Sequence, residues 1–568
     1  MSFSANVSPW NSVRDFAQRL QRCSERELCD QADGLREAFH RGEDRPTTMR
    51  QALGLANEAL RRTLQVDLYD VQLQAAWATS QGHVTEMQTG EGKTLAVGAA
   101  AMLTALQGET VHVATPNAYL AHRDFSLLQP AFQTLGISAG WLSEGDATRA
   151  ARVAAYDCDI TYGTGCEFGF DFLRDQVDKQ LPNQSLLGSQ LFRRLRGLES
   201  GERVGEQRGH GWAIIDEVDN VLLDDAGSPL ILCDAPPGEA EDAQACRAAA
   251  KLACELAPGE CMGFAPDGMP QLNDRGLQRI HAADVRIPVR QLRRPWREYV
   301  LQALQAKYAL RRDVHYVLEQ QAIRLVDAST GRIFSDRSWS EGLHQAVEAK
   351  EGLPISAERS ILAQVTRQRY FRLYRGLSGM TGTAAGGERE FRQIYRLPVS
   401  QIPPRLPNRR QLYPTRAFAQ AEAKWQAIVH ETRILHARRR PVLLGTRTIQ
   451  DSELLAERLQ QQRLDFHLLN GKQDADEAAI VAQAGRLGAI TIATNMAGRG
   501  TDIQLDTEAR RCGGLHVIVC EPHELQRVDR QLVGRGARQG DPGSARMFVS
   551  ADDLLLHLHA PWLQSALR

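Results

Sequence analysis

The sequence predicts an α/β protein whose parallel sheets are flanked by helices, and three observations support this prediction. Short apolar runs typical of buried strands alternate with helical stretches between residues 82 and 227. A glycine-rich turn ending in Gly92-Lys93-Thr94 follows the first of these runs. A second alternating series begins at Pro441, after a proline-rich link at 403–407. Strands joined through helices pair in parallel, so we expect ligands at their carboxyl ends.

The length of 568 residues corresponds to about three or four domains at ~150 residues each. The 68 basic and 69 acidic residues give a formal net charge of −1, so a global basic surface for nucleic acid is absent. The ten cysteines include no C-x-x-C pair, and no zinc site is expected. Neither a signal-peptide pattern nor a run of about 18 apolar residues occurs. We therefore expect a cytoplasmic protein, either free or peripheral at the inner face of the cell membrane.

Residues 12–66 carry apolar side chains at helical spacing, interleaved with arginine and glutamate. Val13, Phe16 and Leu20 illustrate the first of three such segments. The spacing predicts three helices that pack their apolar faces against a core.

The turn from Thr89 to Thr94 is the candidate phosphate site. Gly90 and Gly92 let backbone N–H groups converge on phosphate oxygens, with Glu91 between them, while Lys93 can reach the outer phosphates and the Thr94 hydroxyl can ligate Mg²⁺. A strand over 82–87 and a helix over 95–106 are expected on either side. The strict nucleotide-loop pattern has glycine where Met87 stands, so an ordinary structural turn remains the alternative.

Gln72 precedes this turn by about twenty residues, close to Tyr69. A glutamine amide offers both a donor and an acceptor, the combination that reads the N6/N7 edge of adenine, and an aromatic ring can stack on the base. A single glutamine is equally compatible with a plain helix.

Further strands of the first series are expected at 110–115, 159–164 and 211–215, with a helix at 118–128 between the first two. The last strand leads directly into the quartet Asp216-Glu217-Val218-Asp219. Asp216 can hold Mg²⁺ opposite Thr94, and Glu217 can orient and deprotonate the attacking water. A solvated acidic turn is the alternative.

The amino-acid composition changes after Ser228, where prolines and an alanine-rich helical stretch precede a predicted strand pair at 314–318 and 322–327. We interpret this segment as an inserted domain, with a long loop as the alternative. Residues 378–384, rich in glycine and hydroxyl side chains, follow an aromatic helix at 370–374 and are predicted to form a turn beside a site.

The second series is expected to contain strands and helices in alternation, at 441–446, 449–460, 466–470, 475–484, 490–494 and 516–520. Two loops at 495–502 and 531–540 set arginines among glycines. Such arginines can approach a phosphate closely and stabilise transition-state charge, whereas exposed arginine loops are commonly only solvated.

Taken together, these stretches resemble the SecA preprotein translocase family. The likeness extends over nearly the whole chain, through EMQTGEGKTL, ATPNAYLAHRD, ITYGTGCEFGFDFLRD, IIDEVDNVLLDDAGSPLIL, WSEGLHQAVEAKEG, LSGMTGTA, IATNMAGRGTDI and QLVGRGARQGDPGSARMF. It implies a DEAD-type motor of two RecA-like P-loop domains that hydrolyses ATP, with an inserted α+β domain that contacts preprotein.

The resemblance implies a role for each matching residue. Gln72 would bind adenine, and Thr89, Gly90, Glu91, Gly92, Lys93 and Thr94 the phosphates. Thr94 and Asp216 would hold Mg²⁺, and Glu217 would activate water. From the second motor domain, Gln531, Arg535 and Arg538 would be catalytic, and Arg499 and Asp502 would bind nucleotide.

The resemblance also implies boundaries. These are N-terminal helices at 1–66, a first ATPase domain at 67–227 that returns at 367–400, an inserted preprotein-crosslinking-like domain at 228–366, and a second ATPase domain at 401–568.

Departures from the family pattern set the open hypotheses. Val533 and Ala537 stand where the family usually has arginine and glycine, and the chain ends at Arg568 with no counterpart of the scaffold, wing, two-helix finger and zinc tail. We therefore expect a short SecA-like ATPase that assists export of unfolded preprotein, with the membrane Sec channel or an accessory Sec component as partner. Weak coupling of hydrolysis to transport is expected. A DEAD-type helicase and a regulatory ATPase without translocation are the alternatives, and no nucleic-acid partner is expected.

Overall fold

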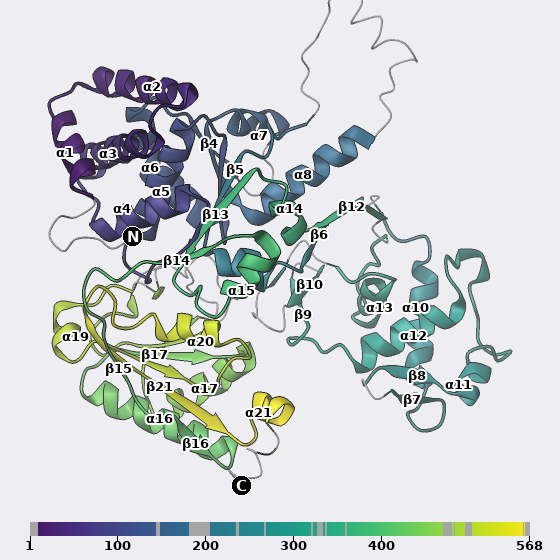
Figure 1. The fold of residues 1–568 in the computed structure, drawn as a ribbon. Coiled ribbons are helices and arrows are strands. Elements are labelled where there is room, and N and C mark those ends of the chain that lie inside the picture. Colours follow the sequence, from purple (N-terminus) through teal and green to yellow (C-terminus); the bar gives the residue numbers. More distant parts are fainter. Residues whose placement is uncertain are drawn as a thin grey trace, which may run out of the picture.

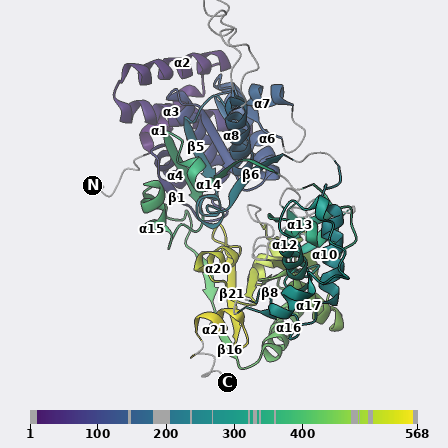
Figure 2. The same ribbon diagram turned by 90° about the vertical axis from the view of Figure 1, so that its right-hand side faces the viewer.

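The computed structural model describes residues 10–143, 148–180, 205–234, 238–265, 268–319, 322–326, 333–334, 338–357, 360–469, 480–481, 483–494, 503–560 and 562. Two sheet-based bodies lie one above the other, and a third, mainly helical body lies to one side of them (Figures 1 and 2). None of the described helices is both long and apolar enough to cross a membrane. The ten cysteines all lie in the described part, and none forms a disulfide.

The first sheet has seven parallel strands in the order β14-β1-β13-β5-β2-β4-β3. Their bounds are β1 Val84–Glu86, β2 Val111–Thr115, β3 Ala139–Trp141, β4 Ile160–Thr164, β5 Trp212–Asp216, β13 Gly376–Thr381 and β14 Val399–Gln401. Helices cover both faces, namely α4 Asp70–Ser80, α5 Lys93–Leu106, α6 Ala118–Thr134, α7 Arg149–Tyr156 and α8 Gly165–Gln180. The predicted parallel, helix-flanked sheet is confirmed.

The segment at 378–384 corrects one expectation. Residues Ser378 to Thr381 are not a turn but the end of β13, which lies between β1 and β5. A Cβ atom on Gly379 would lie 2.5 Å from the carbonyl oxygen of Ile215 and 2.7 Å from the Val218 side chain. The glycine that suggested a turn is therefore required by close packing inside the sheet.

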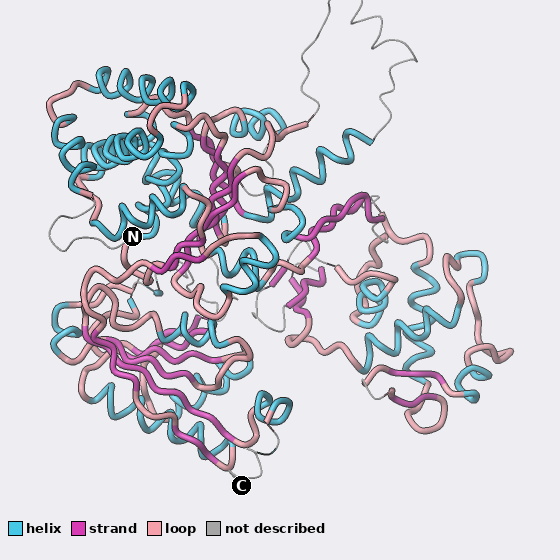
Figure 3. The backbone as a smooth tube through the Cα atoms, viewed as in Figure 1, coloured by secondary structure: helices cyan, strands magenta, loops and turns pink. Residues whose placement is uncertain are grey.

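The three N-terminal helices form as predicted, over α1 Asn11–Leu20, α2 Glu25–Arg41 and α3 Arg45–Leu64. A capping box between Ser24 and Glu27 starts α2, and Gly42, at φ 70°, ends it. The long helix α3 packs against α5 and α6, so these helices thicken the cover on one face of the first sheet (Figure 3).

The inserted segment leaves and rejoins the first body through two strands that the sequence did not predict. β6 Pro229–Asp234 and β12 Ser360–Thr366 form an antiparallel pair. Beyond them lie α10 Ala243–Glu255, α11 Asp274–Arg279, α12 Trp296–Tyr308 and α13 Leu343–Lys350. The hairpin of β7 Met262–Phe264 and β8 Pro270–Leu272 is one small sheet, and the other contains β9 Tyr316–Glu319, β10 Ala322–Val326 and β11 Ile333–Phe334. The predicted strand pair is confirmed as β9 and β10, so the long-loop alternative is wrong.

The second sheet also consists of parallel strands, in the order β15-β21-β20-β17-β19-β18, with β16 beside β21. Its strands are β15 Arg409–Leu412, β16 Arg416–Phe418, β17 Val442–Thr446, β18 His467–Leu469, β19 Ile490–Thr494, β20 Leu515–Val519 and β21 Pro542–Ser550. The flanking helices include α16 Ala421–Ala437, α17 Ile449–Gln461, α19 Thr507–Arg511, α20 Gln526–Val533 and α21 Leu554–His559. Most of the helix expected at 475–484 and the whole loop at 495–502 lie outside the described residues.

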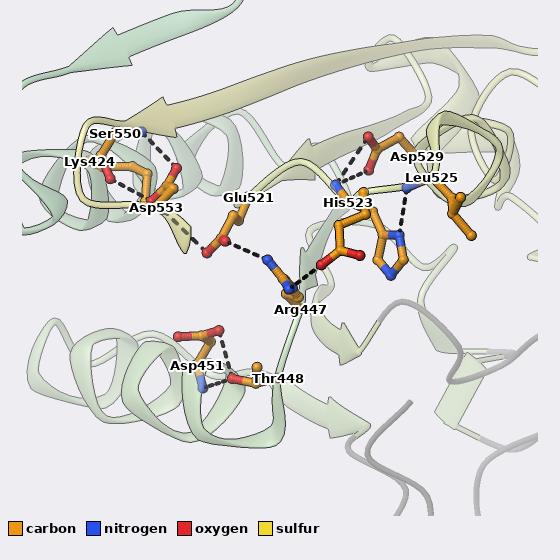
Figure 4. Close-up of polar contacts among 11 residues, drawn as sticks. Lys424, Arg447, Thr448, Asp451, Glu521, His523, Leu525, Asp529, Ser550 and Asp553 are labelled. Carbon is orange, nitrogen blue, oxygen red and sulfur yellow. Dashed lines mark hydrogen bonds and ion pairs between the residues drawn. The ribbon is translucent and has the colours of Figure 1, made fainter. Parts of the chain in front are cut away.

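A buried polar network holds the loop before α20 (Figure 4). Lys424, 1% exposed, lies 3.9 Å from the carboxylate of Glu521, which also pairs with Arg447 at 3.3 Å. The backbone N–H of His523 donates to both carboxylate oxygens of Asp529, at 3.1 and 3.2 Å. Because a buried charge must keep its partners, these contacts fix where α20 begins and which way it faces.

We predict that Gly379→Ala destabilises the first sheet domain by about 1–3 kcal/mol, because the added methyl group meets backbone on β5 that cannot move away freely. Gly263→Ala in β7 is the matched control, since a Cβ atom on Gly263 would have no neighbouring atom within 4 Å. Urea unfolding followed by circular dichroism measures both variants, and equal midpoints for the two would contradict the packing explanation.

Candidate active site

The candidate phosphate loop, Thr89 to Thr94, lies between β1 and α5, at the carboxyl end of the first sheet. Gly90 and Gly92 adopt φ of 91° and 85°, which L side chains rarely take. Gly92 is also the N-cap of α5, and a Cβ atom there would lie 2.2 Å from Nε2 of Gln72. Gly382, just after β13, lies close to Thr89. A Cβ atom on Gly382 would be 2.7 Å from the Thr89 hydroxyl. The positive end of the α5 dipole thus faces a loop suited to an anion.

Gln72 connects α4 to this loop through both ends of its amide. Its Oε1 accepts from the Tyr69 N–H and its Nε2 donates to the Glu91 carbonyl, each at 2.9 Å. The side chain is 3% exposed. Gln72 therefore has a structural role in this state, and its contact with adenine stays a prediction.

Glu217 is held from both sheet domains. Its Oε1 lies 2.5 Å from Nζ of Lys93, and its Oε2 accepts from Nε2 of Gln531 at 3.4 Å. The residue has φ of 50°, an uncommon backbone conformation that places its carboxylate over the phosphate loop. Burial alone lowers the pKa of Lys93, but the carboxylates of Glu217 and Asp216 outweigh it, and the pKa lies above its ordinary value.

Asp216 is the residue most suited to a cation. It is 8% exposed, and its Oδ1 has no hydrogen-bond partner among the described residues. Burial and the neighbouring Glu217 carboxylate raise the pKa of Asp216 to about 7. The nearby Lys93 ammonium lowers this pKa but offsets the rise only in part. Thr94 lies in the first turn of α5, directly after Lys93. A buried carboxylate oxygen without a hydrogen-bond partner among the described residues fits the hard oxygen ligands that Mg²⁺ takes.

The last acid of the quartet has a different role. Asp219, 2% exposed, accepts from the hydroxyls of Thr381 at 2.8 Å and Thr383 at 2.6 Å. The polar side chains at 381–383 thus bond to the acidic segment, as the sequence suggested, although their backbone starts in a strand. This contact joins the end of β13 to the end of β5.

Helix α20 of the second sheet domain lies against the first through one face. Arg527 pairs with Asp224 at 2.5 Å, both largely buried. One turn later, Arg530 donates to the carbonyl of Ala385 at 2.8 Å, beside the contact of Gln531 with Glu217. Positions three and four residues apart share a helix face, so one short helix reaches three segments of the other domain.

The glycine–arginine loop after α20 packs on the phosphate loop. The Arg538 side chain would lie 3.2 Å from a Cβ atom on Gly90, and Gln539 donates to the Gly90 carbonyl at 2.8 Å. Arg535 and Arg538 are 7% and 8% exposed, so neither is a solvated surface side chain. Arg499 and Asp502 lie outside the described residues.

Ala537 adopts φ of 55°, a left-handed backbone conformation that glycine takes more readily than alanine. Its side chain is buried. An alanine in this conformation carries strain of about 1 kcal/mol.

Sequence reasoning missed several residues of the site, among them Asp124, Arg527, Arg530 and Gln539. A signal existed for Asp124, because it shares the helix face of Leu120, Ala121 and Leu128, which are buried. An acid within an apolar stripe needs a specific partner. The other three gave no local signal, because their partners lie in the other domain.

Comparison with known proteins gives consistent matches. The model of the SecA DEAD-like domain matches residues 5–392, and that of the SecA P-loop domain matches 407–511 and 506–566. The chain is 42% identical to protein translocase subunit SecA of Desulfovibrio desulfuricans, over 91% of this chain and 58% of that protein. It is 39% identical to the Caldicellulosiruptor saccharolyticus subunit, over 96% and 64%. It is 38% identical to protein translocase subunit SecA 2 of Bacillus thuringiensis, over 97% and 67%.

The chain thus spans about three fifths of the length of the first two of these relatives. Among solved structures, S. cerevisiae Dbp5 bound to RNA and ADP BeF3 aligns over 91% of both chains, at 13% identity. Its TM-score of 0.40 is too low to bear on function.

We predict that Gln72→Glu weakens nucleotide binding about 10-fold or more. A carboxylate still accepts from the Tyr69 N–H, but it faces the Glu91 carbonyl without a proton to donate, which costs about 1–3 kcal/mol. Titration with a fluorescent ADP analogue measures the change. Gln81→Glu, at the exposed end of the same helix, is the control, and equal affinities for the two variants would show that the amide bridge does not hold the loop.

Proposed function

The chain belongs to the SecA family, and from this premise we propose that it hydrolyses ATP between its two sheet domains and thereby drives or assists the export of unfolded polypeptide. The observation that supports this most directly is the position of Glu217, between Lys93 of one domain and Gln531 of the other. A general base shared across an interface can act only when both domains are in place, which suits a motor.

The proposed domain boundaries are those expected from the sequence: 1–66, 67–227 with a return at 367–400, 228–366 and 401–568. The exit and return of the chain through β6 and β12 support an inserted domain. The link between β14 and β15 supports the start of a second motor domain near residue 401.

We assign the nucleotide roles as follows. Lys93 exchanges Glu217 for the outer phosphates, which frees the carboxylate to orient and deprotonate water. The N–H groups from Thr89 to Thr94 bind phosphate, and Gln72 is assigned to the adenine base. Arg535 and Arg538 approach the transferring phosphate from the second domain, together with Gln531. Arg499 and Asp502 are proposed to complete the nucleotide site.

Thr94 and Asp216 would hold Mg²⁺, which neutralises charge on the phosphate oxygens when it is bound. The orphaned Oδ1 of Asp216 supports this assignment. No zinc site is proposed.

Unfolded preprotein is the proposed substrate, and the inserted domain the proposed contact. The membrane Sec channel or an accessory Sec component is the proposed partner, which would place the protein in the cytoplasm or at the inner face of the membrane. The net charge of −1 favours this over a helicase, because nucleic-acid binding rests on neutralising phosphates. The buried Glu217 and its partners favour a working ATPase over a purely regulatory one.

We predict that Glu217→Gln binds ATP at least as tightly as the wild type but hydrolyses it about 10²-fold or more slowly. The amide keeps the size of the side chain, loses its basicity and no longer holds Lys93 by charge. Lys93→Ala should lose binding and turnover together. Phosphate release and nucleotide titration measure both quantities, and unchanged turnover in Glu217→Gln would refute the role of this residue.

The proposed function is tested by the ligand that stimulates hydrolysis. We expect turnover to rise at least twofold with an unfolded polypeptide and to stay unchanged with single-stranded RNA. The same polypeptide in its folded form is the control for ligand chemistry, and Glu217→Gln is the control for contaminating ATPases. Stimulation by RNA with a steep salt dependence would favour the helicase alternative.

A further inference from the structure

The link between the two sheet domains is fastened to the first domain by a stacked arginine. This link runs from β14 to β15 and joins the two sheet-based bodies (Figure 1). Within it, the guanidinium carbon of Arg405 lies 4.0 Å from the centroid of the Tyr69 ring. Arg405 has neither an ion pair nor a hydrogen bond among the described residues, so the stacking contact is what holds its side chain.

Tyr69 stands next to the residue that reaches the candidate phosphate loop. It is the N-cap residue of α4, and its backbone N–H donates to Oε1 of Gln72 at 2.9 Å. The other end of the same amide donates to the Glu91 carbonyl, also at 2.9 Å. Tyr69 is 46% exposed. An exposed aromatic ring so close to the loop is a surface on which a nucleobase can stack.

The Arg405 guanidinium already covers one face of this ring. A separation of 4.0 Å is van der Waals contact, so no second flat group fits between the guanidinium and the ring. The stacking of an exposed arginine on an aromatic ring is weak, whereas a nucleobase stacks on such a ring more strongly. A base that reaches this face therefore displaces the arginine at modest cost.

The next residue of the link contacts the second sheet domain. A Cβ atom on Gly540 would lie 3.0 Å from Cδ1 and 3.1 Å from Cβ of Leu406. Gly540 follows Gln539, whose side chain donates to the Gly90 carbonyl at 2.8 Å. Two adjacent link residues thus lie on opposite domains, and each is connected to the candidate phosphate loop. Release of Arg405 frees the link from the first domain and leaves Leu406 on the second.

We propose that Arg405 occupies the base-stacking face of Tyr69 as a stand-in for the nucleobase, and that a bound adenine nucleotide displaces it and frees the link from the first domain. This inference rests on the proposed function, because the base belongs to the proposed ATPase site. The contact is autoinhibitory, since it lowers the apparent affinity for nucleotide according to the fraction of molecules in which the arginine is stacked. A ligand without a base meets no such competition.

The test compares a ligand that has a base with one that lacks it. Affinities for ADP and for pyrophosphate, both with Mg²⁺, are measured by isothermal titration calorimetry. Arg405→Ala should raise the affinity for ADP about two- to fivefold, the change expected when one exposed cation–π contact no longer competes. The affinity for pyrophosphate should stay unchanged.

Arg409→Ala is the matched control, because Arg409 is an exposed arginine at the start of β15 and its loss removes the same charge. Both affinities should stay at the wild-type value in this variant. In a Tyr69→Leu background, which lacks the ring, Arg405→Ala should no longer raise the affinity for ADP. A role of Arg405 in the general stability of the link would depend on neither the ring nor the base.

A weaker affinity of Arg405→Ala for ADP would overturn the inference and show that the arginine binds nucleotide. An unchanged affinity, an equal gain for pyrophosphate, an equal gain in Arg409→Ala, or a gain that persists without the Tyr69 ring would overturn it as well. These outcomes leave the proposed function intact, because the wild type would still bind nucleotide and hydrolyse it. Failure of the wild type to bind ADP would overturn both.

Discussion

The arrangement of the site depends on one buried ion pair, between Lys93 and Glu217 at 2.5 Å. Their side chains are 10% and 5% exposed, and two charges removed from water to that degree are stable only when they are paired. The pair requires the start of α5 and the end of β5 to be adjacent, which their common position at the carboxyl edge of one parallel sheet provides. It also holds the lysine beside the carboxylate, so a phosphate that takes the lysine would release the carboxylate.

The second sheet domain meets this pair through α20 and the loop that follows it. Arg527, Arg530 and Gln531 lie on one face of a short helix, and Gln539 reaches the phosphate loop directly. These contacts are polar and separate, unlike the continuous apolar packing within each sheet domain. Such an interface can open and close at modest cost, since each contact can be exchanged for water.

The position of α20 is in turn set inside its own domain. The N–H of His523 is held by Asp529, and Glu521 lies between Lys424 and Arg447. The buried network therefore transfers the rigidity of the second sheet to the residues that face Glu217. In the first sheet domain, Asp219 just after β5 is held in a similar way by the hydroxyls of Thr381 and Thr383. Each half of the site is thus braced by buried polar contacts within its own domain.

The amino-acid sequence by itself determined the features that depend on neighbours along the chain. The helical spacing of apolar residues predicted the three N-terminal helices. The alternation of strand-like and helical stretches predicted the parallel sheets, and short apolar runs predicted the strand pair of the inserted segment. Short motifs gave the strand–turn–helix around Gly90 to Thr94, the position of the acidic quartet at a strand end, and the family. These predictions succeeded because a helix face, a glycine turn or a strand end is encoded within about twenty residues.

Only the tertiary structure decided which distant groups meet. It inserted Ser378–Thr381 into the middle of a sheet, paired β6 with β12 across more than a hundred residues, and bound both ends of the Gln72 amide. It also brought Arg527 to Asp224. None of these contacts has a local pattern, because burial and charge pairing depend on where separate elements pack, and a side chain acquires its partner only once the chain is folded.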